Sequence, residues 1–382
     1  MRILLLGEYS KLHNTLKEGL ISLGHEVVLV GDGDGFKNFP VDISIKAKWL
    51  DNTPLKFIKV GIYKLFGIDL SKLERAIRCY LKLRKFKGFE VVQLINEKPI
   101  KTYPWAERWL LKKVFININR KVLLSCGADY TNVSYYLKHQ EERSWLIPML
   151  ENPTLQKKYS YVFDFLSRAH RKTHDYIFKN IGAVVATDFD YVPPLKNHIK
   201  FVGLIPNPIK IPSEMHIPST QGPVEILLGI NRWNYHTKGI TYFEKALDII
   251  LQKFPERVKI HTTENLPYEE YIKYMQNAHI LLDQVFAKDQ GYNALEAMAM
   301  GKVVFTGADK DFLTFYNLRE DSVCINALPD VPYLVEKLEM LIENKDQIEK
   351  ISIAARQFVE KNHKSEDIAR VYEKLYKRLK FL

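Results

Sequence analysis

The sequence is poor in cysteine. Its 382 residues include three cysteines, Cys79, Cys126 and Cys324, which lie far apart and form no C-x-x-C pair. An odd number of widely spaced cysteines predicts neither a disulfide framework nor a zinc site, and it is typical of a protein from a reducing compartment. Signatures of nucleic-acid-binding modules (RRM, KH or helix-turn-helix) are also missing, so no nucleic-acid partner is expected.

Long apolar runs are missing as well. None approaches the ~18 residues that a membrane-spanning helix needs. The opening MRILLLGEYS has only a short apolar run, which is too short for a secretory signal peptide. The sequence therefore predicts a cytoplasmic protein that contacts a membrane, if at all, from its surface.

What the sequence does have is a concentrated positive charge. The net charge is +11, yet residues 46–121 alone hold 19 Lys+Arg against 6 Asp+Glu, so the rest of the chain is slightly acidic. Residues 53–87 have the pattern of a basic amphipathic helix, interrupted near Gly67. We weigh two interpretations, a solvated basic helix and a docking surface for anionic lipid. The apolar residues that would enter a lipid interface are Phe57, Ile58, Ile62, Tyr63, Leu65 and Phe66.

The pattern of apolar runs predicts two α/β domains with parallel, doubly wound sheets. A run at residues 1–6, a helix pattern ending at Gly24 and a run at 27–30 make a βαβ unit, and similar runs follow to residue 186. A proline-rich stretch at 206–222 predicts a linker, after which the alternation begins again. We therefore expect an N-terminal domain over 1–205, a C-terminal domain over 206–364, and a terminal helix at 365–382 that packs back on the first domain.

One segment of the second domain carries the most specific signal. An apolar run at 280–282 and a loop precede the string Gly291-Tyr-Asn-Ala-Leu-Glu-Ala-Met-Ala-Met-Gly-Lys-Val-Val304. This segment resembles the GT-B glycosyltransferases, in particular family 4 (glycosyl transferases group 1). The resemblance implies the GT-B fold, two Rossmann-like domains facing a cleft, and a hexosyltransferase-type enzyme that uses a nucleotide sugar.

Physical chemistry assigns roles within this string. Gly291, Tyr292 and Asn293 open a helix whose N-terminal N–H groups and partial positive charge suit the oxygens of a diphosphate. Glu296 lies about one turn further along, where its carboxylate can accept hydrogen bonds from vicinal ribose hydroxyls. The alternative is a well-packed Ala/Met helix with one solvated glutamate.

Further donor contacts follow from the resemblance. Arg232 and Lys238 resemble the cationic pair that holds the donor diphosphate, with Asn231 beside them, although their spacing is one residue longer than usual. Cations there would stabilise the negative charge of the leaving diphosphate without a metal ion. Other donor-binding candidates lie at the ends of the following strands: Glu264, in the loop expected to contact the base, and Asp283 and Gln284.

Two departures from the family pattern stand out. Position 288, eight residues before Glu296, is a lysine where the family usually has a second glutamate that contacts the donor sugar. The first loop, Gly7-Glu8-Tyr9-Ser10, lacks the typical Gly-Gly pair. The N-terminal domain should hold the acceptor, and the candidate bases there are His13, Asp129 and Glu97. None of the three is singled out by the sequence.

The resemblance implies transfer of a sugar from a nucleoside-diphosphate sugar to a glycan or polyprenyl-diphosphate-linked acceptor, in bacterial surface polysaccharide assembly. No cofactor or metal is expected. Two alternatives stay open: another GT-B activity, such as a nucleotide-sugar epimerase, and a degenerate transferase that binds without catalysis. The sequence does not identify the donor sugar, the linkage, the stereochemistry or the oligomeric state.

Overall fold

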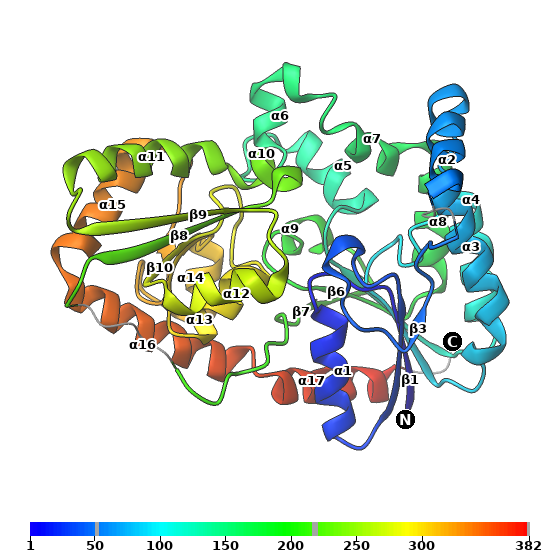
Figure 1. Cartoon of the computed structure of the whole chain (residues 1–382). Helices are drawn as coiled ribbons and strands as arrows, with labels where there is room; N and C mark the ends of the chain where they lie inside the picture. The colour runs from blue at the N-terminus through cyan, green and yellow to red at the C-terminus, as the bar shows by residue number, and fades with distance from the viewer. Residues whose placement is uncertain (50–52, 216–220, 380–382) are drawn as a thin grey trace.

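The computed structural model describes residues 1–49, 53–215 and 221–379 as two α/β lobes (Figure 1). Part of the predicted linker, including Pro218, and the last three residues lie outside the described residues. Among the described residues, no helix is both long and apolar enough to cross a membrane.

The N-terminal lobe is built on a seven-stranded parallel sheet in the order β3-β2-β1-β4-β5-β6-β7. Its buried strands are runs of Val, Ile, Leu and Ala, as expected for a sheet covered by helices on both faces. The strands are β1 (Arg2–Leu6), β2 (Glu26–Gly31), β3 (Ile43–Ser44), β4 (Val91–Leu94), β5 (Arg120–Ser125), β6 (Ala183–Ala186) and β7 (Phe201–Leu204). The helices are α1 (Leu12–Ser22), α2 (Thr53–Phe66), α3 (Leu70–Lys82), α4 (Pro104–Phe115), α5 (Tyr130–Lys138), α6 (Ile147–Glu151), α7 (Ser160–Leu166), α8 (Arg168–Asn180) and α9 (Val192–Leu195).

The C-terminal lobe has a five-stranded parallel sheet in the order β12-β11-β10-β8-β9. Its strands are β8 (Val224–Ile230), β9 (Val258–Glu264), β10 (Ile280–Leu282), β11 (Val303–Thr306) and β12 (Ile325–Asn326). Its helices are α10 (Tyr235–Lys238), α11 (Ile240–Lys253), α12 (Tyr268–Asn277), α13 (Tyr292–Ala299), α14 (Lys310–Tyr316), α15 (Val331–Glu343) and α16 (Lys345–Asn362). The predicted α/β class and parallel sheets are confirmed.

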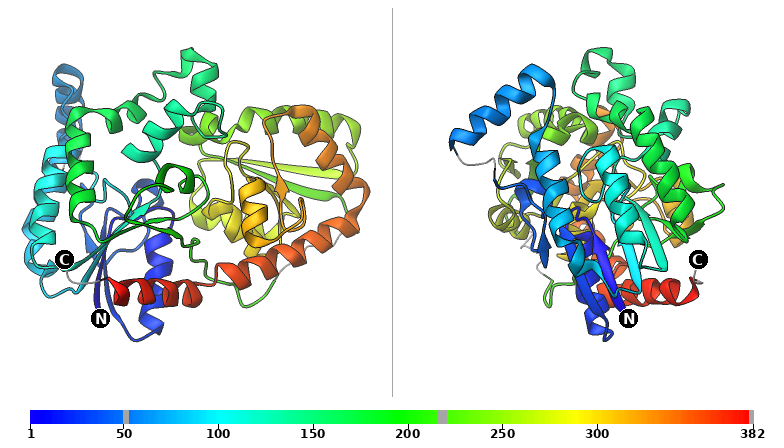
Figure 2. Two further views of the ribbon diagram at one scale, coloured as in Figure 1. Left: turned by 180° about the vertical axis from the view of Figure 1, so that it is seen from behind. Right: turned by 90° about the vertical axis from the view of Figure 1, so that its right-hand side faces the viewer.

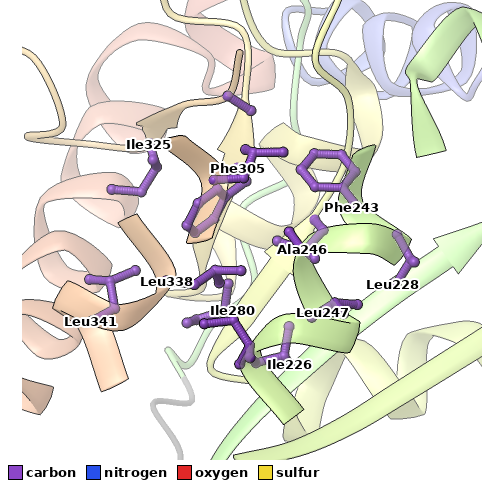
Figure 3. Packing of buried hydrophobic residues seen from close by; sticks show 14 of the residues in the cluster. Ile226, Leu228, Phe243, Ala246, Leu247, Ile280, Phe305, Ile325, Leu338 and Leu341 are labelled. Carbon is purple, nitrogen blue, oxygen red and sulfur yellow. The ribbon is translucent and has the colours of Figure 1, made fainter. Parts of the chain in front are cut away.

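A continuous apolar core fixes the positions of the strands in the C-terminal lobe. Ile226 and Leu228 of β8, Ile280 of β10 and Phe305 of β11 pack against Phe243 of α11 (Figure 3). The same cluster reaches the helix α15 through Leu338 and Leu341. Because β8, β10 and β11 are parallel neighbours, their carboxyl ends lie side by side. Loops that leave this edge of the sheet therefore place their side chains close together.

The chain crosses between the lobes twice, and the two crossings are paired. Ile209 N donates to His363 O at 2.6 Å, and Ser365 N donates to Ile209 O at 3.0 Å. The second crossing leads into α17 (Ser365–Arg378), which lies beside α1 on the N-terminal lobe (Figure 2). Tyr372 and Tyr376 of α17 are fully buried against the core of that lobe.

Gly19 lets α1 and α17 approach closely. A Cβ at this position would lie 2.5 Å from Ser365 O and 2.9 Å from Ala369 Cβ. We expect Gly19→Ala to lower the free energy of unfolding by about 1–3 kcal/mol, since overpacking a tight contact forces the backbone apart. Thermal melting measures this loss. The control is Gly61→Ala on α2, where a Cβ meets open space, and equal melting of both variants would contradict the packing argument.

Candidate active site

Glu296 lies on α13 where the two lobes meet. Its Oε1 accepts a hydrogen bond from the Tyr268 hydroxyl at 3.0 Å and lies 3.4 Å from Nζ of Lys11, which belongs to the N-terminal lobe. Burial raises the pKa of Glu296, while Lys11 and Tyr268 oppose that rise. The side chain is 17% exposed, so a ligand between the lobes would meet Glu296, Tyr268 and Lys11 together.

Lys238, Asp283 and Asn293 form a second group at the same edge of the sheet. Nζ of Lys238 lies 2.8 Å from Oδ1 of Asp283, and Asn293 Nδ2 donates to the same oxygen at 2.9 Å. Asp283 is buried, whereas the Lys238 side chain is 25% exposed. The lysine is thus held by a buried carboxylate beside the first turn of α13, where a diphosphate would meet helix N–H groups and a cation.

Gly239 sets the position of Lys238. It ends α10 with φ +70, and a Cβ there would lie 2.3 Å from Cγ2 of Val285. The backbone is tied down as well, because Val285 N donates to Lys238 O at 3.0 Å. Both the positive φ and the contact require glycine at this turn.

Arg232, Asn231 and Glu264 lie at a more exposed rim. NH2 of Arg232 pairs with Oε2 of Glu264 at 2.5 Å, and both side chains are about half exposed. Asn231 accepts from Trp233 N at 3.0 Å and so caps a short turn. The structure therefore separates the two predicted cations by environment: Lys238 is held among buried groups, and Arg232 is held by Glu264 in solvent. Their predicted roles stay predictions.

The remaining donor candidates differ in what they contact. Gly291 is the N-cap of α13, and a Cβ there would lie 3.5 Å from Nε2 of Gln284. Tyr292 instead bridges the lobes, because its hydroxyl lies 2.6 Å from Oγ1 of Thr15 and 2.5 Å from Pro208 O. Tyr292 thus fixes α13 against α1, while Gly291 and Gln284 stay beside the first turn.

His13, the first candidate base, does not lie at the edge of a cleft between the lobes, where an acceptor could reach it. Its ring is fully buried, with Nδ1 2.7 Å from Gly7 O and Nε2 3.2 Å from Nε2 of Gln93. Gln93 in turn accepts from the hydroxyl of Tyr376 on α17 at 2.7 Å. Burial lowers the pKa of His13 to about 4. The helix α17 covers His13, and the sequence pattern of residues 1–30 does not reveal this contact.

Asp129 caps a helix. It is the N-cap of α5, accepts from Asn132 N at 2.7 Å, and also accepts from Oγ of Ser125 at 2.6 Å. Burial, with the nearby Glu97 charge, raises the pKa of Asp129 to about 7. The geometry accounts for Asp129 as a structural residue, and its predicted catalytic role has no supporting contact.

Glu97 is held by two histidines of α8. Its carboxylate lies 2.8 Å from Nε2 of His170 and 2.7 Å from Nδ1 of His174. Burial opposes its ionisation, but the hydrogen bonds from both rings lower the pKa of Glu97 to about 2. For His174, burial is likewise outweighed by the bond to Glu97, so its pKa is raised. The group is therefore an ion pair inside the N-terminal lobe.

This ion pair predicts a pH-dependent stability. Glu97 stabilises the fold above its unfolded pKa near 4.5, and His174 does so below its unfolded pKa near 6.5. Glu97→Gln should therefore lower the free energy of unfolding most between these values, by about 2–3 kcal/mol, and less at alkaline pH. Melting curves at pH 5.5 and pH 9 test this, with Glu141→Gln on the surface as the control. An equal loss at both pH values would count against the ion pair.

Lys288, which replaces the expected second glutamate, joins the two lobes. Its Nζ lies 2.6 Å from Oε2 of Glu142, and its backbone N donates to Oδ1 of Asp190 at 3.1 Å. The next residue, Asp289, accepts from Phe189 N at 3.0 Å. The segment therefore makes domain–domain contacts where the family pattern places a donor-sugar contact.

Sequence reasoning missed Arg143, a further residue of this interface. Its Nε donates to Val285 O at 3.0 Å, its NH1 donates to Oδ1 of Asn326 at 2.9 Å, and its NH2 donates to Ala327 O. Nothing in the local sequence around Arg143 signals this role, because every acceptor is more than 140 residues away. Lys11 was missed as a partner of Glu296 for the same reason, whereas Tyr268 lies only 28 residues before Glu296 and was missed because it starts a different helix, α12.

One group of carboxylates in the described part of the chain has the spacing of a cation site. Ligand oxygens of Asp188, Asp190 and Asp289 lie within 4.8 Å of one another. Burial first, and mutual repulsion second, raise the pKa of Asp188 and Asp289 well above the ordinary value. Backbone N–H groups already bind Asp190 and Asp289. Protonated carboxyls can therefore lie this close together without a bound cation.

Comparisons with known proteins give a family match for the C-terminal lobe and a structural likeness for the whole chain. Residues 225–374 match the family described as glycosyl transferase-like. No curated protein matches the chain in sequence. Among solved structures, sucrose-phosphate synthase from Thermosynechococcus elongatus is similar at 15% identity and a TM-score of 0.61, covering 99% of both chains.

Two further structures are similar over their whole length. HepE of Anabaena, solved with UDP and glucose, has 11% identity and a TM-score of 0.58 over 99% of this chain and 100% of its own. MnaA of S. aureus, solved with UDP, has 10% identity and a TM-score of 0.54 over 99% of this chain and 97% of its own. At such identities the likeness establishes the fold.

The family match covers the lobe that carries Lys238, Asp283 and Glu296, and the structural likeness covers both lobes. Together they support a glycosyltransferase enzyme. The chain has the GT-B fold of two Rossmann-like domains, and its residues 225–374 match a glycosyl transferase-like family, which is consistent with the expected group 1 type.

Proposed function

We propose that the chain transfers a sugar from a nucleoside-diphosphate sugar to a glycan or polyprenyl-diphosphate-linked acceptor, in the assembly of a bacterial surface polysaccharide. One observation carries the proposal. A carboxylate on α13, Glu296, and a cation held by a buried carboxylate, Lys238, flank the first turn of one helix at the carboxyl edge of a parallel sheet. Doubly wound sheets bind nucleotides at this edge.

In this proposal each group has a role in the reaction. Glu296 accepts hydrogen bonds from the ribose hydroxyls, and Lys238 with the N–H groups of α13 binds the diphosphate. The bond from the anomeric carbon to the diphosphate breaks, an acceptor hydroxyl oxygen bonds to that carbon, and its proton leaves to the diphosphate or to solvent. Lys238 stabilises the charge that develops on the leaving group. The transfer is metal-free, and family resemblance favours retention of configuration.

UDP is the nucleotide to test first. The HepE structures hold UDP with glucose and UDP-glucose, and the MnaA structure holds UDP. These proteins share only their fold with this chain, so UDP-sugars are a starting point for a panel that also includes GDP-, ADP- and dTDP-sugars.

We also propose that the N-terminal lobe docks on anionic lipid at the cytoplasmic face of a membrane, where a polyprenyl-linked acceptor would lie. The helix α2 extends from the lobe (Figure 2) and exposes Phe57 (75%), Leu65 (78%) and Phe66 (70%). Residues 53–68 hold three lysines and no acidic residue. Apolar side chains between lysines match an interface of acyl chains and anionic headgroups.

A neighbouring apolar hollow extends this surface. It has a volume of about 570 Å³ and lies between α3 and α4, where Tyr80, Trp105 and Trp109 are each 40–60% exposed. Arg108 and Lys112 also line it. Trp and Tyr beside cationic side chains are typical of the membrane–water boundary.

Replacing Phe57 and Leu65 by glutamate should reduce binding to anionic vesicles at least tenfold, because it removes two inserted side chains and adds repulsion. Cosedimentation measures the bound fraction, and Ile199→Glu, a change at an exposed residue far along the chain, is the control. Raising salt from about 0.1 to about 1 M, which shortens the Debye length from ~10 to ~3 Å, should release the wild type. Equal retention on neutral vesicles at high salt would contradict the lipid surface.

A transfer assay tests the activity itself. The protein is incubated with each radiolabelled nucleotide sugar and a bacterial lipid extract, with and without EDTA. Label in a new glycolipid or glycan, insensitive to EDTA, supports the proposal. Release of a free, epimerised sugar with no glycoside would identify the epimerase alternative, and binding without any conversion would identify a degenerate transferase.

A further inference from the structure

The first loop of the N-terminal lobe carries an unusual lysine. Lys11 is the N-cap of α1 and has a left-handed backbone with φ 69, and Ser10 before it has φ 50. Residues other than glycine rarely adopt this conformation. The side chain makes no cap hydrogen bond, and a cation at the positive end of a helix is electrostatically unfavourable.

The ammonium group of Lys11 reaches across the domain interface. Nζ lies 3.4 Å from Oε1 of Glu296 and 4.0 Å from the centre of the Tyr268 ring. Both partners belong to the C-terminal lobe. One turn further along α1, Oγ1 of Thr15 lies 2.6 Å from the hydroxyl of Tyr292 at the start of α13. The N-terminal ends of α1 and α13 are therefore brought together, with Lys11 and Glu296 beside them.

Charges of both signs surround Lys11: Asp34 accepts from Ser10 N at 3.0 Å, and Glu8 accepts from Asn14 N at 2.9 Å. Lys37 also lies nearby, with Nζ 3.0 Å from Oγ of Ser10 and paired with Asp34 at 2.8 Å. Lys11 is paired with Glu296, the residue that the proposed function assigns to the donor ribose. When a ribose occupies Glu296, Lys11 loses much of that contact, while its ammonium group stays at the domain interface beside Glu296 and the Tyr268 ring. A diphosphate at this place would supply a new negative partner for the ammonium group of Lys11.

We propose that Lys11 binds the diphosphate of the nucleotide donor from the N-terminal lobe, and that its contact with Glu296 is the ligand-free counterpart of that interaction. This inference rests on the proposed function. It adds a cation that the family resemblance did not supply, in a loop that lacks the typical glycine pair. It also links both lobes to the occupied donor site, since the C-terminal lobe binds the ribose and the diphosphate and the N-terminal lobe adds Lys11 to the diphosphate.

The test compares binding of UDP, UMP and uridine by calorimetry, with the GDP, ADP and dTDP series in parallel. Lys11→Met should weaken binding of the nucleoside diphosphate that the wild type prefers by about 10- to 100-fold, the range for charge-assisted hydrogen bonds. Binding of the matching nucleoside should change less than threefold. Lys11→Arg should restore much of the diphosphate affinity because it keeps the charge.

Two further variants separate this role from an effect on folding. Lys11→Gly suits the positive φ, so it should melt at or above the wild-type temperature yet bind the diphosphate as weakly as Lys11→Met. Lys210→Met is the matched control, because Lys210 is 75% exposed and pairs with Glu18 away from Glu296, and its diphosphate binding should equal that of the wild type.

Different results would overturn different claims. If the wild type binds none of the four diphosphates, the proposed function is wrong and the role of Lys11 falls with it. If the wild type binds one of them and Lys11→Met binds it within threefold, only the role of Lys11 is wrong. An equal loss for nucleoside and diphosphate would also overturn it, since Lys11 would then act through Glu296 alone.

Discussion

Replacing Glu296 by alanine is expected to weaken nucleoside diphosphate binding by about 100-fold, since a carboxylate that accepts from two ribose hydroxyls loses two charge-assisted hydrogen bonds. The variant also removes the carboxylate that Tyr268 and Lys11 contact at 3.0 and 3.4 Å. Calorimetry on the wild type and the variant, with the same nucleotide, measures the change.

A ligand lacking both ribose hydroxyls makes this prediction specific. The wild type should bind a 2′,3′-dideoxynucleoside diphosphate about as weakly as Glu296→Ala binds the ordinary one, and the variant should no longer distinguish the two. Glu256→Ala, at an exposed position of the same lobe, is the matched control and should bind like the wild type. A Glu296→Ala protein that still prefers the ribonucleotide would show that another group reads the ribose.

Replacing Lys238 by methionine should lower the turnover number by about 100- to 1,000-fold, the effect of removing one group that stabilises developing negative charge in a transition state. Nζ of Lys238 is held 2.8 Å from the buried Asp283, so its position is set before the donor arrives. Nucleotide affinity should fall less than turnover, because the charge on the leaving diphosphate grows during the reaction. Steady-state release of nucleoside diphosphate measures turnover.

The loss of Lys238 also leaves Asp283 without its counter-ion, and the double variant Lys238→Met/Asp283→Asn addresses this effect. It should regain thermal stability without regaining turnover. Lys245→Met, an exposed lysine on α11, is the control for the loss of one charge. If Lys238→Met turns over within threefold of the wild type, or if the double variant recovers activity, Lys238 does not stabilise the leaving group.

The sequence predicts those parts of the fold that depend on local pattern. Apolar runs and their spacing place the strands, and the structure confirms the helix end near Gly24 and the helix start at Gly291. The grouping of Lys238, Asp283 and Asn293 follows from the same logic, because neighbouring parallel strands end at one edge of a sheet.

Contacts between distant segments could not be predicted in this way. Periodicity reveals which face of a helix is buried but not what buries it. His13 lies inside because α17, more than 350 residues further on, brings Tyr376 to Gln93 beside it. Lys11 meets Glu296, and Arg143 meets Val285, only once both lobes have folded and met. The local departure from Gly-Gly marked the first loop as unusual without showing what it contacts.

The departure at Lys288 has a structural explanation of this kind. Its ammonium group pairs with Glu142 of the opposite lobe at 2.6 Å, and Arg143 next to Glu142 binds three groups of the C-terminal lobe. The segment that carries a glutamate in the family pattern thus holds the lobes together here. Because the donor sugar would lie near this segment, its identity does not follow from the family pattern.

The most direct test of the account is a thermal-shift measurement of the wild type with UDP-, GDP-, ADP- and dTDP-sugars. A nucleotide sugar at 100 times its Kd should add about 2.7 kcal/mol to the free energy of unfolding, so we predict that at least one of the four series raises the melting temperature by several degrees and that Glu296→Ala abolishes this shift. No shift with any of the four series at millimolar concentration would contradict the central claim that this interface binds a nucleotide sugar.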